Sequence, residues 1–359
     1  AKRRRIAAAI DAMIACYTLG MLVMYVRVVA DMCVDAAAAF TDDPQWLDRN
    51  RYFGASFLLF FGLTCMRQLS ELAASTVAGL ITIVYIAVAM IIEYSWFTYK
   101  HRTFAHPGVH WAHLNGSVAL ALPVITVAIG YHYNAPAMYR EMEDATPRKF
   151  RRAVVAATTL CTGLFLIVGL VGYFTFGPEV DGPTAGGNIV NSYPKKDRLI
   201  AVARIALAAH IVCVFPVIAI SVRDALHRLS LRVAGQHESA EDGEAMLKAH
   251  RSLIVLEAAI VCGAAVTIAI DVPHIGTVVD IIGVLFGLFL VFIAPGLMGL
   301  AINGGMWRTS RAAQERLEAV GAFVKPSARR ELISLAIAAV GTVALMVGLL
   351  SVLGLIRTV

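Results

Sequence analysis

The sequence has few charged residues for its length. Only 16% of its 359 residues are Asp, Glu, Lys or Arg, whereas soluble domains carry about 25%. Hydrophobic residues make up 58%, which excludes an ordinary soluble domain and also a disordered chain. The class that remains is a helical protein that crosses a membrane several times, because each crossing needs about 20 apolar residues.

Cysteine is also scarce. There are six Cys residues, with no Cys-x-x-Cys pair and no Cys/His spacing typical of zinc. This excludes a disulfide scaffold and a structural zinc domain. No small-residue cleavage site closes the first apolar run, so a signal peptide is excluded as well. The basic residues before that run fit the inner flank of a first spanning helix.

Uninterrupted apolar runs predict nine spanning helices in one polytopic domain covering residues 1–359. Lipid offers the backbone no hydrogen-bond partners, so runs of this length must be helical. The expected spans lie at about residues 6–30, 52–68, 74–98, 116–138, 153–177, 198–222, 252–271, 276–302 and 332–356.

The distribution of Lys and Arg predicts the orientation. With the N-terminus in the cytoplasm, 21 of the 31 basic residues fall in inside segments and eight in outside segments. Cytoplasmic loops carry such an excess of positive charge. The net charge of +6 is therefore explained by topology and does not indicate a nucleic-acid partner.

The fourth span contains an unusual set of helix-breaking residues. Pro123, Gly130 and Pro136 each weaken or interrupt a helix. Interrupted backbone survives at membrane depth only where it is buried in protein or lines a cavity, and broken helices form the substrate sites of many secondary transporters. A structural kink explains the same residues equally well.

Several stretches together resemble the amino acid/auxin permease family of transmembrane amino acid transporters. The first stretch is residues 25–31, and the second comprises residues 127–132, Pro136 and residues 139–141. The third comprises residues 176–177 and 188–194, and the fourth His210 and residues 215–216. The fifth comprises residues 272–275, 282–283 and 294–295. The resemblance covers essentially the whole chain.

The resemblance implies an all-α, leucine-transporter-like (APC) helical bundle. Family members typically have eleven helices, so the nine spans match the third to the eleventh, and the first two are expected to be absent. Because the first helix supplies half of the substrate site in that fold, the 359-residue chain is expected to be transport-incompetent by itself.

The resemblance also implies a substrate site at the break in the fourth span. The expected substrate-binding residues are Ala128, Ile129, Gly130, Tyr131 and His132, faced by Tyr25 and His210. An intramembrane charge costs about 2.5–3.5 kcal/mol on insertion scales. Asp280 and Glu257 are therefore candidates for gating or coupling, and the resemblance adds Glu141; structural ion pairs are the alternative. Arg27 and Arg204 lie nearer span ends, where snorkelling explains a long charged side chain.

The expected function is secondary active transport of amino acids, with no cofactor. No Ser or Thr lies between Asp197 and Ser221, whereas the fold's sodium site usually draws hydroxyls from this helix. This favours protons as the coupling ion, with His as the natural carrier; a uniporter stays open. The expected partners are the amino acid, protons and the lipid bilayer. The plasma membrane is favoured over an organelle.

A histidine-rich stretch supports a rival class. His106, His110 and His113 have the spacing HxxxHxxH, and imidazole clusters bind zinc, copper or iron. A histidine-box membrane metalloenzyme needs several such boxes, and no second box occurs in the sequence. A solvated loop is the simpler explanation. An amino acid sensor built on a transporter fold is a third possibility.

Overall fold

The chain is mostly helical in the part that the computed structural model describes, which comprises residues 2–65, 73–111, 118–181, 187–233, 251–272, 274–303 and 328–352. No strand occurs in these ranges. Seven of their helices are long and apolar enough to cross a membrane, namely Ile6–Ala37, Val77–His101, Pro147–Val180, Arg198–Ser230, Ile254–Asp271, Ile275–Leu300 and Ala328–Val352.

These seven helices coincide with seven of the nine predicted spans. The other two ranges, residues 52–68 and 116–138, also contain helix. The first holds a helix of 16 residues, and the second a 12-residue helix that stops at Ile129. Both ranges adjoin residues outside the described part of the chain. Their passage through the membrane stays a prediction.

The helices group into two compact units. Unit 1 comprises residues 1–113 and 162–279, and unit 2 comprises residues 114–161 and 280–359. The helix α7 (Pro147–Phe176) contributes residues to both units.

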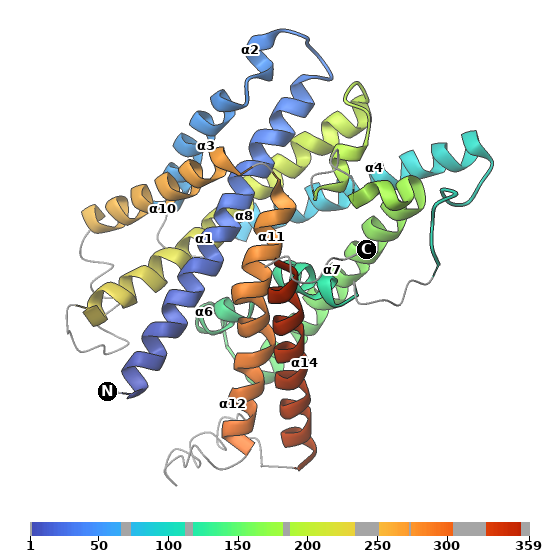
Figure 1. Cartoon of the computed structure of the whole chain (residues 1–359). Helices are drawn as coiled ribbons and strands as arrows, with labels where there is room; N and C mark the ends of the chain where they lie inside the picture. Colours follow the sequence, from blue (N-terminus) through green and yellow to red (C-terminus); the bar gives the residue numbers. More distant parts are fainter. Residues whose placement is uncertain are drawn as a thin grey trace. The chain divides into compact units, whose positions relative to one another are not determined.

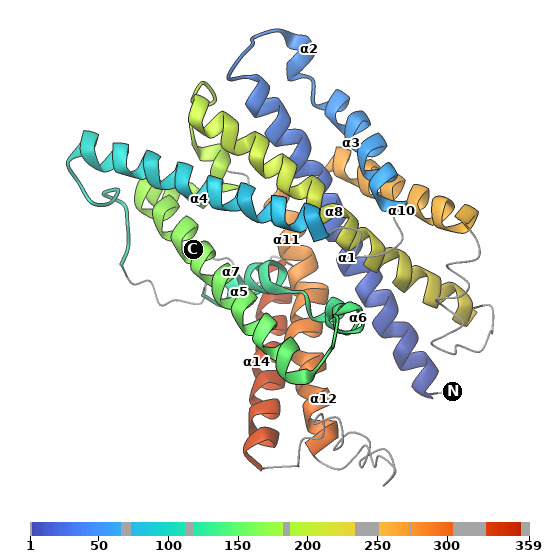
Figure 2. The ribbon, with the colours of Figure 1, turned by 180° about the vertical axis from the view of Figure 1, so that it is seen from behind.

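Unit 1 is built around helix α8. Its elements are α1 (Lys2–Ala37), α2 (Pro44–Leu47), α3 (Arg49–Thr64), α4 (Ala73–His101), η3 (Gly177–Asp181), η4 (Ile189–Ser192), α8 (Arg198–Val233), α10 (Arg251–Asp271) and most of α11 (Ile275–Ile282). Helix α8 packs along α1 and α4, and α1 also contacts α3 and α10. Figures 1 and 2 show α1 and α8 side by side from both directions.

The core of unit 1 contains both aromatic side chains and small residues. Phe60 of α3 and Phe215 of α8 stack with ring centroids 3.8 Å apart, and both are fully buried. Ala30 of α1 and Ala201 of α8 are also fully buried. Small residues let helix backbones approach closely, which is how helices associate in lipid, where no hydrophobic effect drives them together.

Unit 2 is a smaller helical group. It contains α5 (Val118–Ile129), η2 (His132–Asn134), α6 (Ala135–Glu141), the first part of α7, the π-helical segments η5 (Gly283–Gly287) and η6 (Phe289–Ile293), α12 (Ala294–Asn303) and α14 (Ala328–Val352). Helices α12 and α14 lie side by side in Figures 1 and 2. Glycines make this contact possible: a Cβ added at Gly296 would lie 2.8 Å from the Cβ of Ala338.

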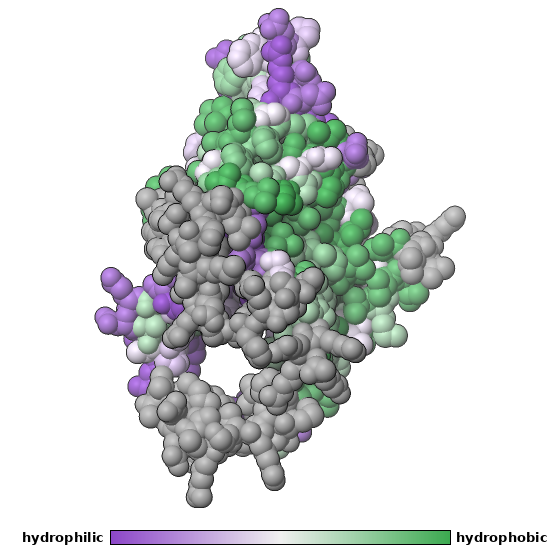
Figure 3. Space-filling view, turned by 90° about the vertical axis from the view of Figure 1, so that its left-hand side faces the viewer, coloured by the Kyte–Doolittle hydropathy of each residue, from purple (hydrophilic) through white to green (hydrophobic). Residues whose placement is uncertain are grey.

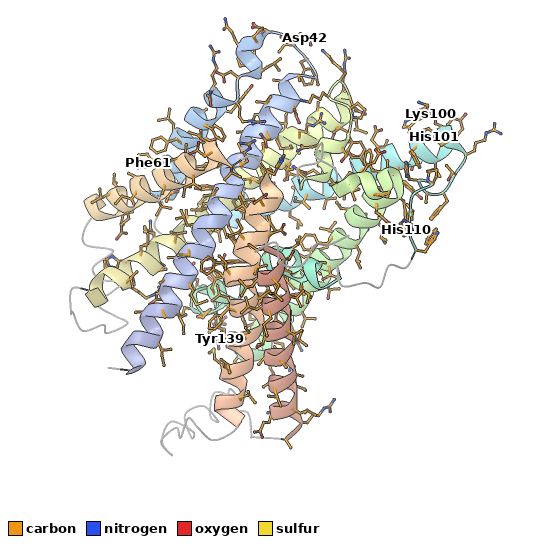
Figure 4. All side chains as sticks on the ribbon, in the orientation of Figure 1. Asp42, Phe61, Lys100, His101, His110 and Tyr139 are labelled. Atoms are coloured by element: carbon orange, nitrogen blue, oxygen red, sulfur yellow. The ribbon has the colours of Figure 1, made fainter. Side chains whose placement is uncertain are left out.

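The surface of unit 1 changes character along its length. Figure 3 shows hydrophilic residues gathered at the tip that carries α2, and hydrophobic residues over the adjoining helices. Asp42, at this tip in Figure 4, is exposed and pairs with Lys196 at 2.6 Å. A polar tip next to an apolar surface is typical of a helix bundle that leaves the hydrocarbon region of a membrane.

Candidate functional site

The fourth predicted span is interrupted as the sequence indicates. Helix α5 ends at Ile129, Gly130 and Tyr131 are not helical, and the one-turn 3₁₀ segment η2 begins at His132. The amide of Tyr131 donates to the carbonyl of Ile129 at 3.0 Å, and the amide of Asn134 donates to the carbonyl of Tyr131 at 2.9 Å. The chain therefore makes a tight irregular turn between α5 and α6.

The residue types at the turn explain its geometry. Pro136 lies in the first turn of α6, where its missing donor costs nothing and its fixed φ suits the start of a helix. Pro123 lies inside α5 and obstructs the normal hydrogen-bond ladder. The carbonyl of Pro123 also accepts a bond from the hydroxyl of Thr126 at 2.6 Å.

The turn presents polar groups at the end of α5. The last four carbonyls of a helix lack intrahelical partners and carry the negative end of its dipole, so the end of α5 attracts a cationic group. The Tyr131 and His132 rings stack with centroids 5.3 Å apart, and the His132 side chain is exposed. Gly130 is buried, so its backbone lies within unit 2.

The π-helical segment η5 packs directly against α5. A Cβ added at Gly283 would lie 2.6 Å from the carbonyl oxygen of Pro123, so only glycine fits at this crossing. Single π-turns within helices occur frequently at functional sites. The continuous apolar run at residues 283–293 gives no sequence signal for π geometry, and the prediction therefore missed it.

Two predicted site residues lie in unit 1. His210 of α8 directs Nδ1 at the carbonyl oxygen of Gly79 on α4, 2.8 Å away. A carbonyl only accepts hydrogen bonds, so Nδ1 carries the proton and Nε2 of the neutral ring keeps its lone pair. Tyr25 of α1 is partly buried. The role of both residues in substrate binding stays a prediction.

The three coupling candidates have different surroundings. Glu257 of α10 lies 3.1 Å from Nδ1 of His227 on α8, and both side chains are at most 13% exposed. Glu141 at the end of α6 and Asp280 on α11 are exposed and belong to unit 2. Of these three, Glu257 is the one in a buried ion pair with a titratable partner.

Arg204 is a buried residue whose role the sequence did not reveal. The prediction that it snorkels to water is wrong, because its side chain on α8 is fully buried. Its guanidinium donates to the carbonyls of Tyr193 at 2.9 Å, Val190 at 3.2 Å and Pro194 at 3.4 Å. Arg204 thus holds the segment before α8 onto the helix.

Arg27 does not snorkel either. The residue, on α1, is 6% exposed. Its side chain pairs with Asp31 at 3.1 Å, one turn further along the helix. Asp31 also pairs with Arg49 of α3 at 2.8 Å. The three residues join α1 to α3, and Arg27 and Asp31 are buried in this contact.

The histidine-rich stretch forms no metal site among the residues described. No group of three or more His, Cys, Asp or Glu residues there is close enough to hold a metal ion. Nδ1 of His106 already accepts a bond from the Gly108 amide at 3.1 Å. His110 lies in the same loop, and His113 lies outside the described residues.

Seven long apolar helices together with the interrupted helix α5 define the chain as part of an integral membrane protein. Residues 4–324 match the family described as transmembrane amino acid transporter protein, and the chain belongs to that family. The family consists of transporters, which removes the histidine-box enzyme as an interpretation.

Individual relatives are more distant. The chain is 24% identical over 296 residues to the mouse sodium-coupled neutral amino acid transporter 7, a match that covers 79% of this chain and 60% of the relative. It is 25% identical over 302 residues to the human solute carrier family 38 member 8, covering 81% and 67%. The zebrafish sodium-coupled neutral amino acid transporter 7 is 21% identical, covering 87% and 67%. The chain thus spans 60% of the length of the mouse relative.

Proposed function

We propose that the protein is a secondary active transporter of amino acids, and that its substrate binds at the α5–η2 turn. The observation that carries this proposal is the helix end at Ile129, followed by two non-helical residues. The negative end of the α5 dipole suits an α-ammonium group. Residues 128–132 would supply this part of the site. Tyr25 and His210, which belong to unit 1, stay proposed substrate-binding residues on the family resemblance alone.

Neutral amino acids are the proposed substrate class. The turn sequence Ala-Ile-Gly-Tyr-His-Tyr-Asn at residues 128–134 contains no acidic side chain to pair with a cationic substrate. Glu257, the acid that is buried with a partner, is occupied by His227 at 3.1 Å. Two of the named relatives are described as transporters of neutral amino acids, which supports the same class.

Protons are the proposed coupling ion. Helix α8 has no Ser or Thr between Asp197 and Ser221, so it offers no hydroxyl ligands for sodium there. The His227–Glu257 pair supplies groups that can exchange a proton within unit 1, with Glu141 and Asp280 as further candidates. The names of the mouse and zebrafish relatives favour sodium instead, and the coupling experiment must separate the two ions.

Uptake by the intact protein in proteoliposomes tests the function. Radiolabelled neutral amino acids are offered with an inward pH gradient at zero sodium, and then with an inward sodium gradient at equal pH. We expect saturable uptake that the pH gradient drives. Uptake driven by sodium alone would overturn proton coupling, and saturable binding without flux would identify a sensor instead of a transporter.

The proposed site has its own test. Tyr131→Ala removes a ring at the turn, and we expect it to raise the KM for uptake at least tenfold, about 1.4 kcal/mol of binding energy. Phe165→Ala on α7 removes an exposed ring of similar size and serves as the matched control. An unchanged KM in Tyr131→Ala would place the substrate elsewhere.

We further propose that the protein resides in the plasma membrane, with the N-terminus of this chain in the cytoplasm. The excess of basic residues in the segments predicted to lie inside supports the orientation.

A further inference from the structure

The end of α4 and the loop after it carry exposed aromatic and basic side chains that the proposed transport site does not use. Trp96, Tyr99, Phe104 and Trp111 are each at least 60% exposed. Lys100, His101 and Arg102 are exposed between them. These seven residues are called the aromatic–basic patch. Figure 4 shows Lys100 and His101 at the free end of α4, and His110 on the loop that follows.

The loop folds back along the helices. Arg102 adopts a positive φ of 51°, which reverses the chain as α4 ends. The amide of His106 then donates to the carbonyl of Phe174 at 2.7 Å, and the hydroxyl of Tyr94 donates to the carbonyl of Phe104 at 2.8 Å. These bonds hold the loop beside α4 and α7, and not in the water beyond their ends.

The fold-back places exposed rings at the level of the spans. Phe104 and Trp111 lie 5.3 and 5.6 Å, between ring centroids, from Phe174. Phe174 and Tyr94 belong to the candidate spans Pro147–Val180 and Val77–His101. Because Phe104 and Trp111 are 60% and 75% exposed, lipid is the surrounding that suits rings at this level.

The length of α4 also places the rings of the patch at the edge of the hydrocarbon region. From Val77, at about 1.5 Å per residue, Trp96 lies about 29 Å and Tyr99 about 33 Å along α4, against a hydrocarbon thickness of about 30 Å. Both rings therefore fall at the boundary between acyl chains and headgroups, where Trp and Tyr are enriched. Lys100 and Arg102 follow at headgroup level.

Among the described residues, the two permanent cations of the patch have no ion-pair partner. The sequence contains no Asp or Glu between Glu93 and Glu141. In the part of the chain that the structure describes, neither Lys100 nor Arg102 has a carboxylate within ion-pair distance. The loop packs on η3, where Gly108 approaches Pro178. The segment η3 also carries Glu179, which is a single acid, whereas the patch has the two permanent cations Lys100 and Arg102.

We propose that the aromatic–basic patch binds anionic phospholipids, with the rings among the upper acyl chains and with Lys100 and Arg102 on the headgroup phosphate. Cationic side chains next to interfacial rings provide both the charge and the depth that such a lipid needs. With the N-terminus in the cytoplasm, the end of α4 lies on the outside, so the lipid proposed here belongs to the outer leaflet. This proposal does not depend on the transported substrate or on the coupling ion.

Fluorescence quenching by brominated lipid tests the proposal on the intact protein. Trp46 and Trp307 are replaced by Phe, so that emission comes from Trp96 and Trp111. The protein is placed in phosphatidylcholine nanodiscs that contain the same small fraction of either brominated phosphatidylglycerol or brominated phosphatidylcholine. We expect at least twofold stronger quenching by the anionic lipid, and a smaller difference at high salt.

A pair of variants assigns the effect to the patch. K100Q/R102Q should make quenching by the two brominated lipids equal. Lys196→Gln removes an exposed lysine that already pairs with Asp42 at 2.6 Å, and it should leave the twofold difference intact. Equal quenching by both lipids in the parent protein would overturn the anionic preference, and absence of quenching would show that the loop lies in water.

Discussion

Arg204 shows how a single residue fixes the segment before α8. Its guanidinium is fully buried and bonds three carbonyls of residues 190–194. A buried charge is costly unless its donors are satisfied, so the helix and the segment stabilise each other only while both are in place. The planar fork of Arg reaches several acceptors at once, which Lys does not.

We expect Arg204→Met to lower the free energy of unfolding by about 3 kcal/mol, because charged hydrogen bonds are lost and buried carbonyls are left without donors. Arg204→Lys should recover only part of this loss. The measurement is the thermal unfolding of the purified protein in detergent. Arg198→Gln changes an exposed arginine at the start of the same helix and serves as the control. Equal unfolding temperatures for Arg204→Met and the parent would show that the guanidinium contributes nothing to stability.

His210 makes a second testable contact at this scale. His210→Asn can still donate a hydrogen bond to the carbonyl of Gly79, whereas His210→Leu cannot. We expect His210→Leu to be less stable than His210→Asn by about 1 kcal/mol, measured by the same thermal unfolding. If the order is reversed, apolar packing and not the hydrogen bond holds α8 to α4 at this position.

The important polar residues were easier to identify from the sequence than the partners they contact. Glu257 and His210 were selected because ionisable groups are costly in apolar spans. Their partners, His227 and Gly79, are 30 and 131 residues away in the chain. Such pairings follow from helix packing, which a periodic pattern in one segment does not encode.

At the scale of elements, the packing of unit 2 depends on a glycine at the point where two helical segments cross closely. The π-helical segment η5 meets α5 where Gly283 faces the carbonyl of Pro123. Unlike the tip of a side chain, this carbonyl belongs to the backbone and cannot move aside without moving α5. The turn at Gly130 follows directly from α5, so this crossing positions the proposed substrate site.

We expect Gly283→Ala to separate α5 from η5, to lower stability by about 1–3 kcal/mol as an overpacked core does, and to reduce uptake. Gly263→Ala on α10 is the matched control, since a Cβ there meets nothing within 4 Å and alanine favours helix by about 1 kcal/mol. Unfolding temperature and uptake are measured on both variants. Normal uptake by Gly283→Ala would mean that the crossing does not position the site.

The interruption of α5 was predictable, and the π-helical segments were not. Pro123, Gly130 and Pro136 leave a direct chemical signal in the sequence. Residues 283–293 read as an unbroken apolar run, and a run of this kind has no period that distinguishes a π-turn from an α-turn. The extra residue per turn is set by packing against α5 and α14.

For the whole molecule, apolar runs predicted the membrane class and seven ranges that the structure shows as long apolar helices. The grouping into two units was not predicted, because it depends on contacts between segments far apart in the sequence. The orientation rests on loop charge alone, so it needs a direct measurement.

Cysteine labelling measures that orientation. In a background without the six native cysteines, Lys149→Cys and Lys195→Cys each place one thiol at an exposed position. Because five basic residues fall in the segment at residues 140–152, we expect Cys at 149 to react only after permeabilisation and Cys at 195 to react in intact cells. The opposite pattern would invert the topology.

The π-turns at residues 283–293 also bear on which insertions and deletions the protein tolerates. A π-turn holds one residue more than an α-turn, so a single deletion within η5 can be absorbed as an ordinary α-turn without breaking the helix. The faces downstream are kept as well, because a π-turn and an α-turn sweep nearly the same angle although they differ by one residue. Gly296 and Gly299, which face Ser334 and Ala338 of α14, would therefore stay at that interface. A single deletion in a regular α-helical stretch has the opposite result, since everything downstream then turns by about 100° about the helix axis. The surplus residue thus makes residues 283–293 a place where the chain can lose one residue and still present the same side chains to α14.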